Sequence, residues 1–89
     1  MRIVTKSSRF KKDVRRQLKR GKDREKLAVV VDLLAIHGRI SARYRPHTLQ
    51  GEWWGTFECH IESDWLLIYE VTESSVILHR TGTHADLFE

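Results

Sequence analysis

Residues 65–71, WLLIYEV, decide the fold of this chain. Apolar side chains occupy both alternating sets of positions in this run, as is typical of a central strand that is buried on both faces. TESS, residues 72–75, has the composition of a turn, and VILHRT, residues 76–81, has that of a further strand. The sequence therefore predicts two neighbouring antiparallel strands that are joined by a short turn.

The segment before this run has the alternation of a half-buried strand. Apolar and polar side chains alternate from Trp53 to Glu62, and His60 falls on the polar side. ESD, residues 62–64, then turns the chain. We therefore expect a three-stranded antiparallel meander in which His60 points away from the apolar face.

The N-terminal half begins with a short strand and a helix. RIVT, residues 2–5, is strand-like, and Ser7 or Ser8 can cap a helix that ends near Gly21. Apolar side chains recur every four residues along this helix, at Phe10, Val14 and Leu18. Most of its other side chains are Lys or Arg.

A second helix is expected from Asp23 to Gly38, with an apolar stripe formed by Leu27, Val30, Val31 and Leu34. The predicted order is β-α-α-β-β-β. This order is typical of an α+β domain in which a short N-terminal strand and a helical hairpin pack on one face of an antiparallel sheet. We expect residues 1–89 to form a single domain, because a chain of this length has room for one core.

Cysteine content and hydropathy restrict the cellular setting. The single cysteine, Cys59, cannot form an internal disulfide, which favours a reducing compartment. The longest apolar runs are far shorter than a membrane span. We therefore expect a cytoplasmic protein with no membrane partner.

Positive charge is concentrated at the N-terminus. Residues 1–26 contain 12 Lys and Arg and only three acidic residues, a net charge of +9, whereas the remaining residues have a net charge of −5. Such a surface attracts nucleic acid without reading its sequence. We predict that Arg15, Arg16 and Lys19 contact RNA. A merely solvated helix face is the alternative.

Three histidines and one carboxylate occupy positions where a scaffold can present reactive groups. His47 lies in a loop, His60 on the outward face of a strand, His84 after the last strand, and Asp64 across the turn from His60. Imidazoles can share proton transfer near neutral pH. The same four groups are also able to bind a divalent ion, but the chain has no His-x-x-x-His pattern and no cysteine pair, so we predict neither a metal nor another cofactor.

Three blocks of sequence resemble a known family. They are HTLQGEWWG at residues 47–55, HIESDWLLIY at residues 60–69 and RTGTHADLF at residues 80–88. Together they are similar to the YafQ branch of the RelE-like toxins of bacterial toxin–antitoxin modules. The resemblance is strongest over residues 47–88, and the helical half matches in length and pattern only.

The resemblance implies a RelE-like fold and an mRNA endonuclease that acts in the ribosomal A site. It also implies a cognate antitoxin, commonly in a heterotetramer with the toxin. The family's active-site residues fall on six positions of this sequence: His47, His60, Asp64, Trp65, His84 and Phe88.

The chemistry that the resemblance implies needs no metal. The 2′-OH of the RNA attacks the adjacent phosphorus and leaves a 2′,3′-cyclic phosphate and a 5′-OH. Our hypothesis makes His60 or Asp64 the base and His84 the acid. His47 and Arg80 contact the phosphate, and Trp65 or Phe88 holds an RNA base. We also expect the glycine of RTGTH to form a turn after Arg80 that brings backbone N–H groups close to the phosphate.

The sequence departs from the family at two positions. Phe57 stands where the family often has arginine, and Trp54 stands where it has a basic residue. Stabilisation of the phosphate by a guanidinium is then either missing or supplied by Arg80 or Arg43, and core packing is an equal explanation for Phe57. The alternative function is a catalytically weakened RNA-binding or ribosome-binding module that an antitoxin neutralises. A third possibility is that binding of the antitoxin is all that survives.

Overall fold

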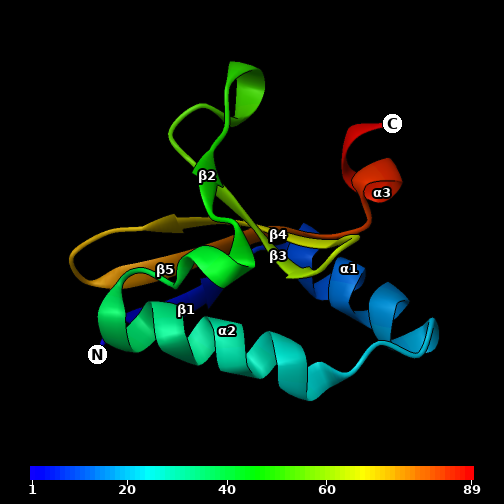
Figure 1. Cartoon of the computed structure of the whole chain (residues 1–89), viewed down its shortest axis with the longest axis horizontal. Helices are drawn as coiled ribbons and strands as arrows, with labels where there is room; N and C mark the ends of the chain where they lie inside the picture. Colours follow the sequence, from blue (N-terminus) through cyan, green and yellow to red (C-terminus); the bar gives the residue numbers. More distant parts are fainter.

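The computed structural model describes all 89 residues and places two helices on one side of a five-stranded sheet (Figure 1). The regular strands and helices are, in chain order, β1 (Ile3–Lys6), α1 (Ser8–Lys19), α2 (Arg24–His37), β2 (His47–Thr48), β3 (Phe57–Glu62), β4 (Trp65–Val71), β5 (Ser75–Gly82) and α3 (His84–Phe88). Two short 3-10 turns, η1 (Ala42–Tyr44) and η2 (Gly51–Trp53), flank β2. The α+β prediction is confirmed.

The strand order is β1-β5-β4-β3-β2, so the run that we expected to be central is central. Trp65, Leu66, Leu67, Ile68 and Tyr69 of β4 are all buried. The expectation of a purely antiparallel sheet is wrong, because β1 pairs parallel with β5. No tight turn joins β1 to β5, so the intervening chain and not a hairpin sets the direction of β1.

The helix boundaries follow the predicted caps. The Ser7 hydroxyl accepts a hydrogen bond from the Phe10 N–H at 3.0 Å, and the Asp23 carboxylate accepts one from the Glu25 N–H at 2.9 Å. Gly38 ends α2 in the left-handed region with φ 74°, which a residue without Cβ adopts at little cost.

The core lies between the helices and the sheet. Val30 and Leu34 of α2 pack in one buried cluster with Leu67 of β4 and Leu78 of β5. Cys59 of β3 belongs to the same cluster and is fully buried, and burial raises the pKa of its thiol to about 12. None of the helices is both long and apolar enough to cross a membrane.

The other side of the sheet carries the segment from β2 to η2 and, apart from it, α3 (Figure 1). Both differ from the prediction. The strand expected from Trp53 begins at Phe57, because Gly51 and Gly55, with φ of 68° and 91°, fold residues 51–55 into a turn. Helix α3 was not expected. We call the side of the sheet between these two segments the open face.

Candidate active site

Strand register brings polar side chains from three strands, β2, β3 and β5, to the open face, around Ile68 of β4. Ile68 of β4 pairs with Glu58 of β3 on one side and with Arg80 of β5 on the other, and Glu58 pairs with His47 of β2. Side chains of residues that pair directly across strands point to the same face. His60 lies two residues after Glu58 and therefore shares this face.

Glu58 joins two of the predicted histidines. One carboxylate oxygen of Glu58 lies 3.2 Å from Nε2 of His47 and 3.9 Å from Nε2 of His60. The two imidazole rings are 6.3 Å apart between centroids. Only 8% of the Glu58 side chain is exposed, so its carboxylate acts on the two rings with little screening by solvent.

Arg45 contacts both rings as well. Its Nη2 lies 3.2 Å from Nδ1 of His60, and its carbonyl oxygen lies 3.1 Å from Nδ1 of His47. The contact with His47 requires a proton on Nδ1, which leaves Nε2 of a neutral His47 without one. Arg45 has φ 49°, the only positive φ outside glycine, a backbone conformation that costs about 1 kcal/mol or more.

Nδ1 of His60 has two mutually exclusive contacts. It accepts a hydrogen bond from Arg45 only when it lacks a proton, and it donates to the carbonyl of Ser63, 3.2 Å away, only when it carries one. The His60 ring therefore keeps a hydrogen-bond partner before and after it takes up a proton. A general base alternates between these two states of protonation.

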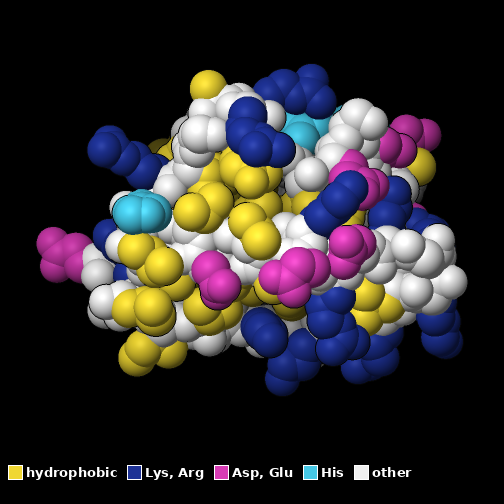
Figure 2. All heavy atoms as spheres, turned by 60° about the horizontal axis from the view of Figure 1, so that its bottom comes forward, with side chains coloured by type: hydrophobic (Ala, Val, Ile, Leu, Met, Phe, Trp, Pro, Cys, Tyr) yellow, Lys and Arg dark blue, Asp and Glu magenta, His cyan; other side chains and the backbone are white.

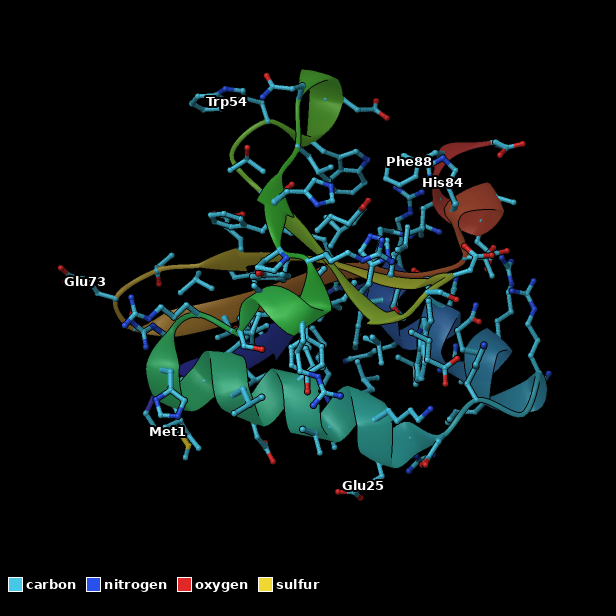
Figure 3. The ribbon with its side chains drawn as sticks, in the orientation of Figure 1. Met1, Glu25, Trp54, Glu73, His84 and Phe88 are labelled. Atoms are coloured by element: carbon cyan, nitrogen blue, oxygen red, sulfur yellow. The ribbon has the colours of Figure 1, made fainter.

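Asp64 and His84 meet through the backbone of α3. Oδ1 of Asp64 accepts a hydrogen bond of 2.9 Å from the His84 N–H, the first of the helix. The His84 ring packs on Phe88 with 5.0 Å between centroids, and both side chains point from α3 towards the β2–η2 segment (Figure 3). Since Ser63 contacts His60 and precedes Asp64, the β3–β4 turn links His60 to His84.

Two predicted substrate contacts need correction. The Trp65 side chain is only 1% exposed, and its indole N–H donates to the Thr81 hydroxyl at 2.9 Å, so its ring cannot stack on an RNA base. Arg80 is 9% exposed, and its Nε and Nη2 donate to the Asp13 carboxylate at 2.7 and 3.1 Å. Asp13 raises the pKa of Arg80, and the guanidinium is committed to this buried pair and not to a phosphate.

The expected Gly turn after Arg80 is also wrong. Arg80 and Gly82 end strand β5, and Thr83 caps α3. The nearby backbone N–H groups already have partners, since the Thr83 N–H donates to Asp86 and the His84 N–H to Asp64. They are not free to hold a phosphate.

The two departures from the family lie apart from the histidines. Phe57 pairs with Tyr69, whose buried ring belongs to the core, and the two rings stack 5.7 Å apart. The phenyl group therefore covers the core. Trp54 is 78% exposed and points away from α3 at the far side of its loop (Figure 3).

Reasoning from sequence missed Glu58 and Arg45. Glu58 alternates with Cys59 on the same strand as His60, two residues before it, and this spacing alone would have placed it beside that histidine. No sequence signal identifies Arg45, because it reaches His60 through an unusual backbone conformation in an irregular segment.

The predicted RNA-contacting side chains Arg15, Arg16 and Lys19 are all exposed on α1. Lys and Arg gather along one edge of the face that carries the helices (Figure 2). Arg15 and Lys19 form no ion pair, whereas Nη1 of Arg16 lies 3.6 Å from the Asp86 carboxylate. No group of three or more His, Cys, Asp or Glu side chains has the arrangement of a metal site.

Comparison with known proteins shows the family to which the chain belongs. The sequence model of the family described as "Bacterial toxin of type II toxin-antitoxin system, YafQ" matches residues 2–89. This chain belongs to the YafQ family. The mRNA interferase toxin YafQ of Escherichia coli (strain K12) is 43% identical over 83 residues, which cover 92% of this chain and 90% of the relative.

Two solved structures extend the comparison. The crystal structure of the E. coli DinJ–YafQ complex includes a chain that matches this YafQ-family toxin with a TM-score of 0.90 and 41% identity over the full length of both chains. A metal-bound toxin from Helicobacter pylori matches with a TM-score of 0.90 and 34% identity, over 99% of this chain and 100% of the other. At the level of the family, these relatives confirm the predicted resemblance and the class of enzyme, an endoribonuclease.

Proposed function

We propose that this chain is the toxin of a type II toxin–antitoxin pair and cleaves mRNA on the ribosome, in the cytoplasm, through attack of the RNA's own 2′-OH. One observation carries the proposal. His47, Glu58 and His60 lie in contact on the open face, and the turn after β3 connects them to Asp64 and His84. One side of the sheet therefore carries the proposed base and acid, His60 and His84, and a proposed phosphate contact, His47.

His60 is the base in this mechanism. The 2′-OH displaces Arg45 from Nδ1 of His60 and gives its proton to this atom, because Nε2 already carries the proton of the neutral ring. The freed oxygen bonds to the neighbouring phosphorus, and the new Nδ1–H donates to the carbonyl of Ser63. The displaced guanidinium of Arg45 contacts a phosphate oxygen and supplies the charge that Phe57 does not.

His84 is the acid. Its imidazole gives a proton to the leaving 5′-oxygen as the bond between that oxygen and phosphorus breaks, which yields the 5′-OH end and the 2′,3′-cyclic phosphate. One carboxylate oxygen of Asp64 accepts a hydrogen bond from the His84 N–H. This contact favours Asp64 as the residue that positions the acid, and not as the base. Phe88, 38% exposed and packed on the His84 ring, is the side chain suited to stack on an RNA base.

His47 completes the phosphate contact. Its Nδ1 donates to the Arg45 carbonyl and its Nε2 faces Glu58, so a protonated ring satisfies both neighbours. In the proposed mechanism a protonated His47 ring beside the scissile phosphate stabilises the charge that develops there.

The partners follow from the same relationship. The DinJ–YafQ complex is a toxin with its antitoxin, and we propose that a cognate antitoxin binds this chain in a heterotetramer. The exposed Arg15 and Lys19 of α1 supply contacts to ribosomal RNA, with Arg16 beside them.

Mapping the ends of message fragments after brief induction of the toxin tests this function. We expect 5′-OH ends and 2′,3′-cyclic phosphates on ribosome-bound message, in the presence of excess chelator. Fragments with 5′-phosphates, or cutting that stops with chelator, would overturn the mechanism, and the second outcome would favour a metal centre of the kind that the H. pylori relative binds. Ribosome binding without any cutting would favour the catalytically weakened binding module.

A further inference from the structure

Helix α3 carries two residues of the proposed site and has little to hold it in place. It contains five residues, and none of them is buried. An isolated helix of this length is unstable in water, because one turn fixes several residues for very few hydrogen bonds. Contacts with other elements must therefore determine where His84 and Phe88 lie.

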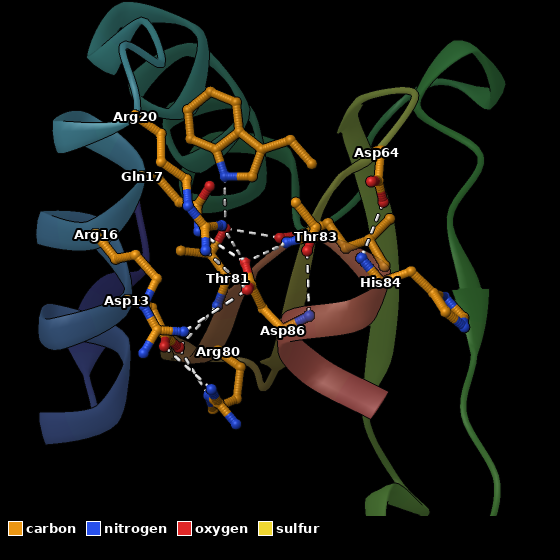
Figure 4. Close-up of polar contacts among 12 residues, drawn as sticks. Asp13, Arg16, Gln17, Arg20, Asp64, Arg80, Thr81, Thr83, His84 and Asp86 are labelled. Atoms are coloured by element: carbon orange, nitrogen blue, oxygen red, sulfur yellow. Dashed lines mark hydrogen bonds and ion pairs between the residues drawn. The ribbon is translucent and has the colours of Figure 1, made fainter. Parts of the chain in front are cut away.

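Asp86 makes most of these contacts. Its Oδ2 accepts hydrogen bonds from Nη1 of Arg20 at 2.6 Å and from Nε2 of Gln17 at 3.0 Å, and its Oδ1 accepts one from Nη2 of Arg20 at 3.1 Å (Figure 4). The paired hydrogen bonds from Arg20 fix direction as well as distance. Gln17 belongs to α1 and Arg20 caps the C-terminus of this helix, so a single carboxylate ties the two helices together.

The same carboxylate also caps its own helix. Oδ2 of Asp86 accepts the Thr83 N–H at 2.9 Å, and the Thr83 hydroxyl accepts the Asp86 N–H at 3.1 Å. This reciprocal capping box begins α3 where it meets α1. The start of the helix and its tether to α1 therefore depend on one side chain.

The tether leaves the reactive face free. Successive residues of a helix are about 100° apart, so His84 and Phe88 share a face and Asp86, two positions from each, lies on the opposite one. Asp86 faces α1 while His84 and Phe88 face the β2–η2 segment (Figures 3 and 4). A shift of Asp86 would rotate or move both rings.

Gly82 provides the space for this arrangement. A Cβ at position 82 would lie 2.9 Å from both Cβ and Oδ2 of Asp86, closer than such atoms pack. The backbone of Gly82 is in the ordinary negative-φ region, so space and not backbone conformation requires the glycine.

The contacts from α1 form a continuous stripe. Asp13, Gln17 and Arg20 follow one another at helical spacing, and Asp13 and Gln17 are only 6% and 1% exposed. Asp13 binds Arg80 and also accepts the Thr81 N–H at 3.2 Å. We call Asp13, Gln17 and Arg20 the polar seam, because they attach α1 to the end of β5 and to α3.

We propose that the polar seam positions the active site and that Asp86, Gln17 and Arg20 are positioning residues for His84 and Phe88. The inference rests on the proposed function, since it assigns these residues to the nuclease reaction. It also divides the basic helix into two parts. Arg20 serves the site through its paired hydrogen bonds with Asp86, whereas Arg15 and Lys19 remain available to RNA.

Three variants disrupt the contact between Asp86 and α1 in different ways. Asp86→Asn keeps an oxygen that can cap the Thr83 N–H but loses the charge that holds Arg20. Arg20→Gln removes the partner, and Gly82→Ala displaces Asp86 without altering any charge. Lys12→Gln removes one positive charge from the same helix at an exposed position with no ion pair, and serves as the matched control.

Cleavage of ribosome-bound message is measured in a single turnover at saturating toxin. We expect the rate to fall about 10-fold to 100-fold in the three variants, because a displacement of about 1 Å at a reacting group costs this much. Ribosome affinity and far-ultraviolet circular dichroism should stay at the parental values. Arg20→Lys, which keeps the charge but not the paired geometry, should recover part of the rate.

Amide hydrogen exchange of residues 84–87 and the ring resonances of Phe88 are measured on the same proteins. We expect faster exchange and shifted Phe88 resonances in the three variants and parental behaviour in Lys12→Gln. Parental exchange together with parental cleavage in Asp86→Asn and Gly82→Ala would overturn the inference. If the parental toxin cuts no message, the proposed function fails, and exchange alone decides whether the polar seam holds α3.

Discussion

Helices α2 and α3 are held to the same sheet by opposite means. Leu27, Val30 and Leu34 of α2 are buried in the core, whereas no residue of α3 is buried and hydrogen bonds to carboxylates fix its position. Apolar burial has no direction and tolerates small shifts, while a hydrogen bond specifies distance and angle. The scaffold therefore relies on burial and the proposed site on polar contacts.

This difference allows the two sides of the sheet to be disturbed separately. Changes to the apolar core under α2 should lower stability and leave the rate of the folded protein unchanged. Changes to the open face should lower the rate and leave stability nearly unchanged. The following predictions test this separation, from the largest expected effect to the smallest.

Removal of the proposed acid should have the largest effect. His84→Ala should lower the rate of message cleavage by about 10²-fold to 10⁴-fold, the contribution of one proton-transfer group. His84 is exposed, so the midpoint of urea unfolding should not change. His37→Ala, at the end of α2 on the other side of the molecule, is the control and should cut at the parental rate. Parental cutting by His84→Ala would refute the acid assignment.

A core substitution should show the reverse pattern. Leu34 is fully buried, and Leu34→Ala should lower the free energy of unfolding by about 2–5 kcal/mol through lost burial and a cavity. Phe88→Ala, at a ring that is 38% exposed, should cost about 1 kcal/mol or less. Chemical denaturation measures both. Equal losses of stability would contradict the division between burial and polar anchoring.

Arg45 tests the source of the phosphate contact. Arg45→Ala should lower the cleavage rate about 10²-fold, as the loss of one group that stabilises transition-state charge does. Arg43→Ala, two residues earlier with its guanidinium over the Tyr44 ring, should have little effect. The two variants are compared in single-turnover cleavage at saturating toxin. A larger loss from Arg43→Ala would show that the guanidinium was assigned to the wrong residue.

Charge reversal on α1 should act on affinity. Arg15→Glu with Lys19→Glu should weaken ribosome binding and lower the slope of log affinity against log salt by at least about 1.5. Adding Arg16→Glu should also slow cleavage, because it places a negative charge near Asp86. Binding titrations at several salt concentrations measure the slope. If the double variant binds ribosomes at low salt with the parental affinity, α1 does not contact RNA.

Strong acid should weaken the tether between Asp86 and α1. The guanidinium of Arg20 holds the pKa of Asp86 well below its usual range, with help from Thr83 and Gln17 and against the cost of burial. A lowered pKa in the folded state means that this stabilisation is complete above about pH 4 and is lost as the pH falls further. Phe88 ring resonances followed below pH 4 should shift in the parental protein and less in Asp86→Asn. Identical titrations would show that Asp86 does not anchor α3.

The parts of the fold that depend on local pattern were predictable. The run at residues 65–71 is β4 to the residue, and Ser7, Asp23 and Gly38 cap the helices as expected. The burial of β4 depends only on the side chains of that run, and each cap on a few adjacent residues. The direction of β1 was not predictable, because it depends on contacts between residues more than 70 positions apart.

The site was predictable in its histidines but not in the groups around them. His47 and His60 come together through β2 and β3, whose pairing places them beside Glu58. Trp65 and Arg80 were assigned to the substrate from blocks of sequence that resemble the family, yet these blocks also contain residues that build the core or contact the polar seam. Asp86 both caps α3 and binds Arg20 and Gln17, and its spacing from Thr83 indicates only the cap.

The buried thiol of β3 also has a practical consequence. Cys59 is inaccessible, and its raised pKa keeps it from forming the nucleophilic thiolate near neutral pH. A second cysteine introduced at exposed Ala85 would therefore be the one group that reacts with a maleimide dye or spin label. Movement of the last turn could then be followed by fluorescence or by electron paramagnetic resonance without removing the native sulfur.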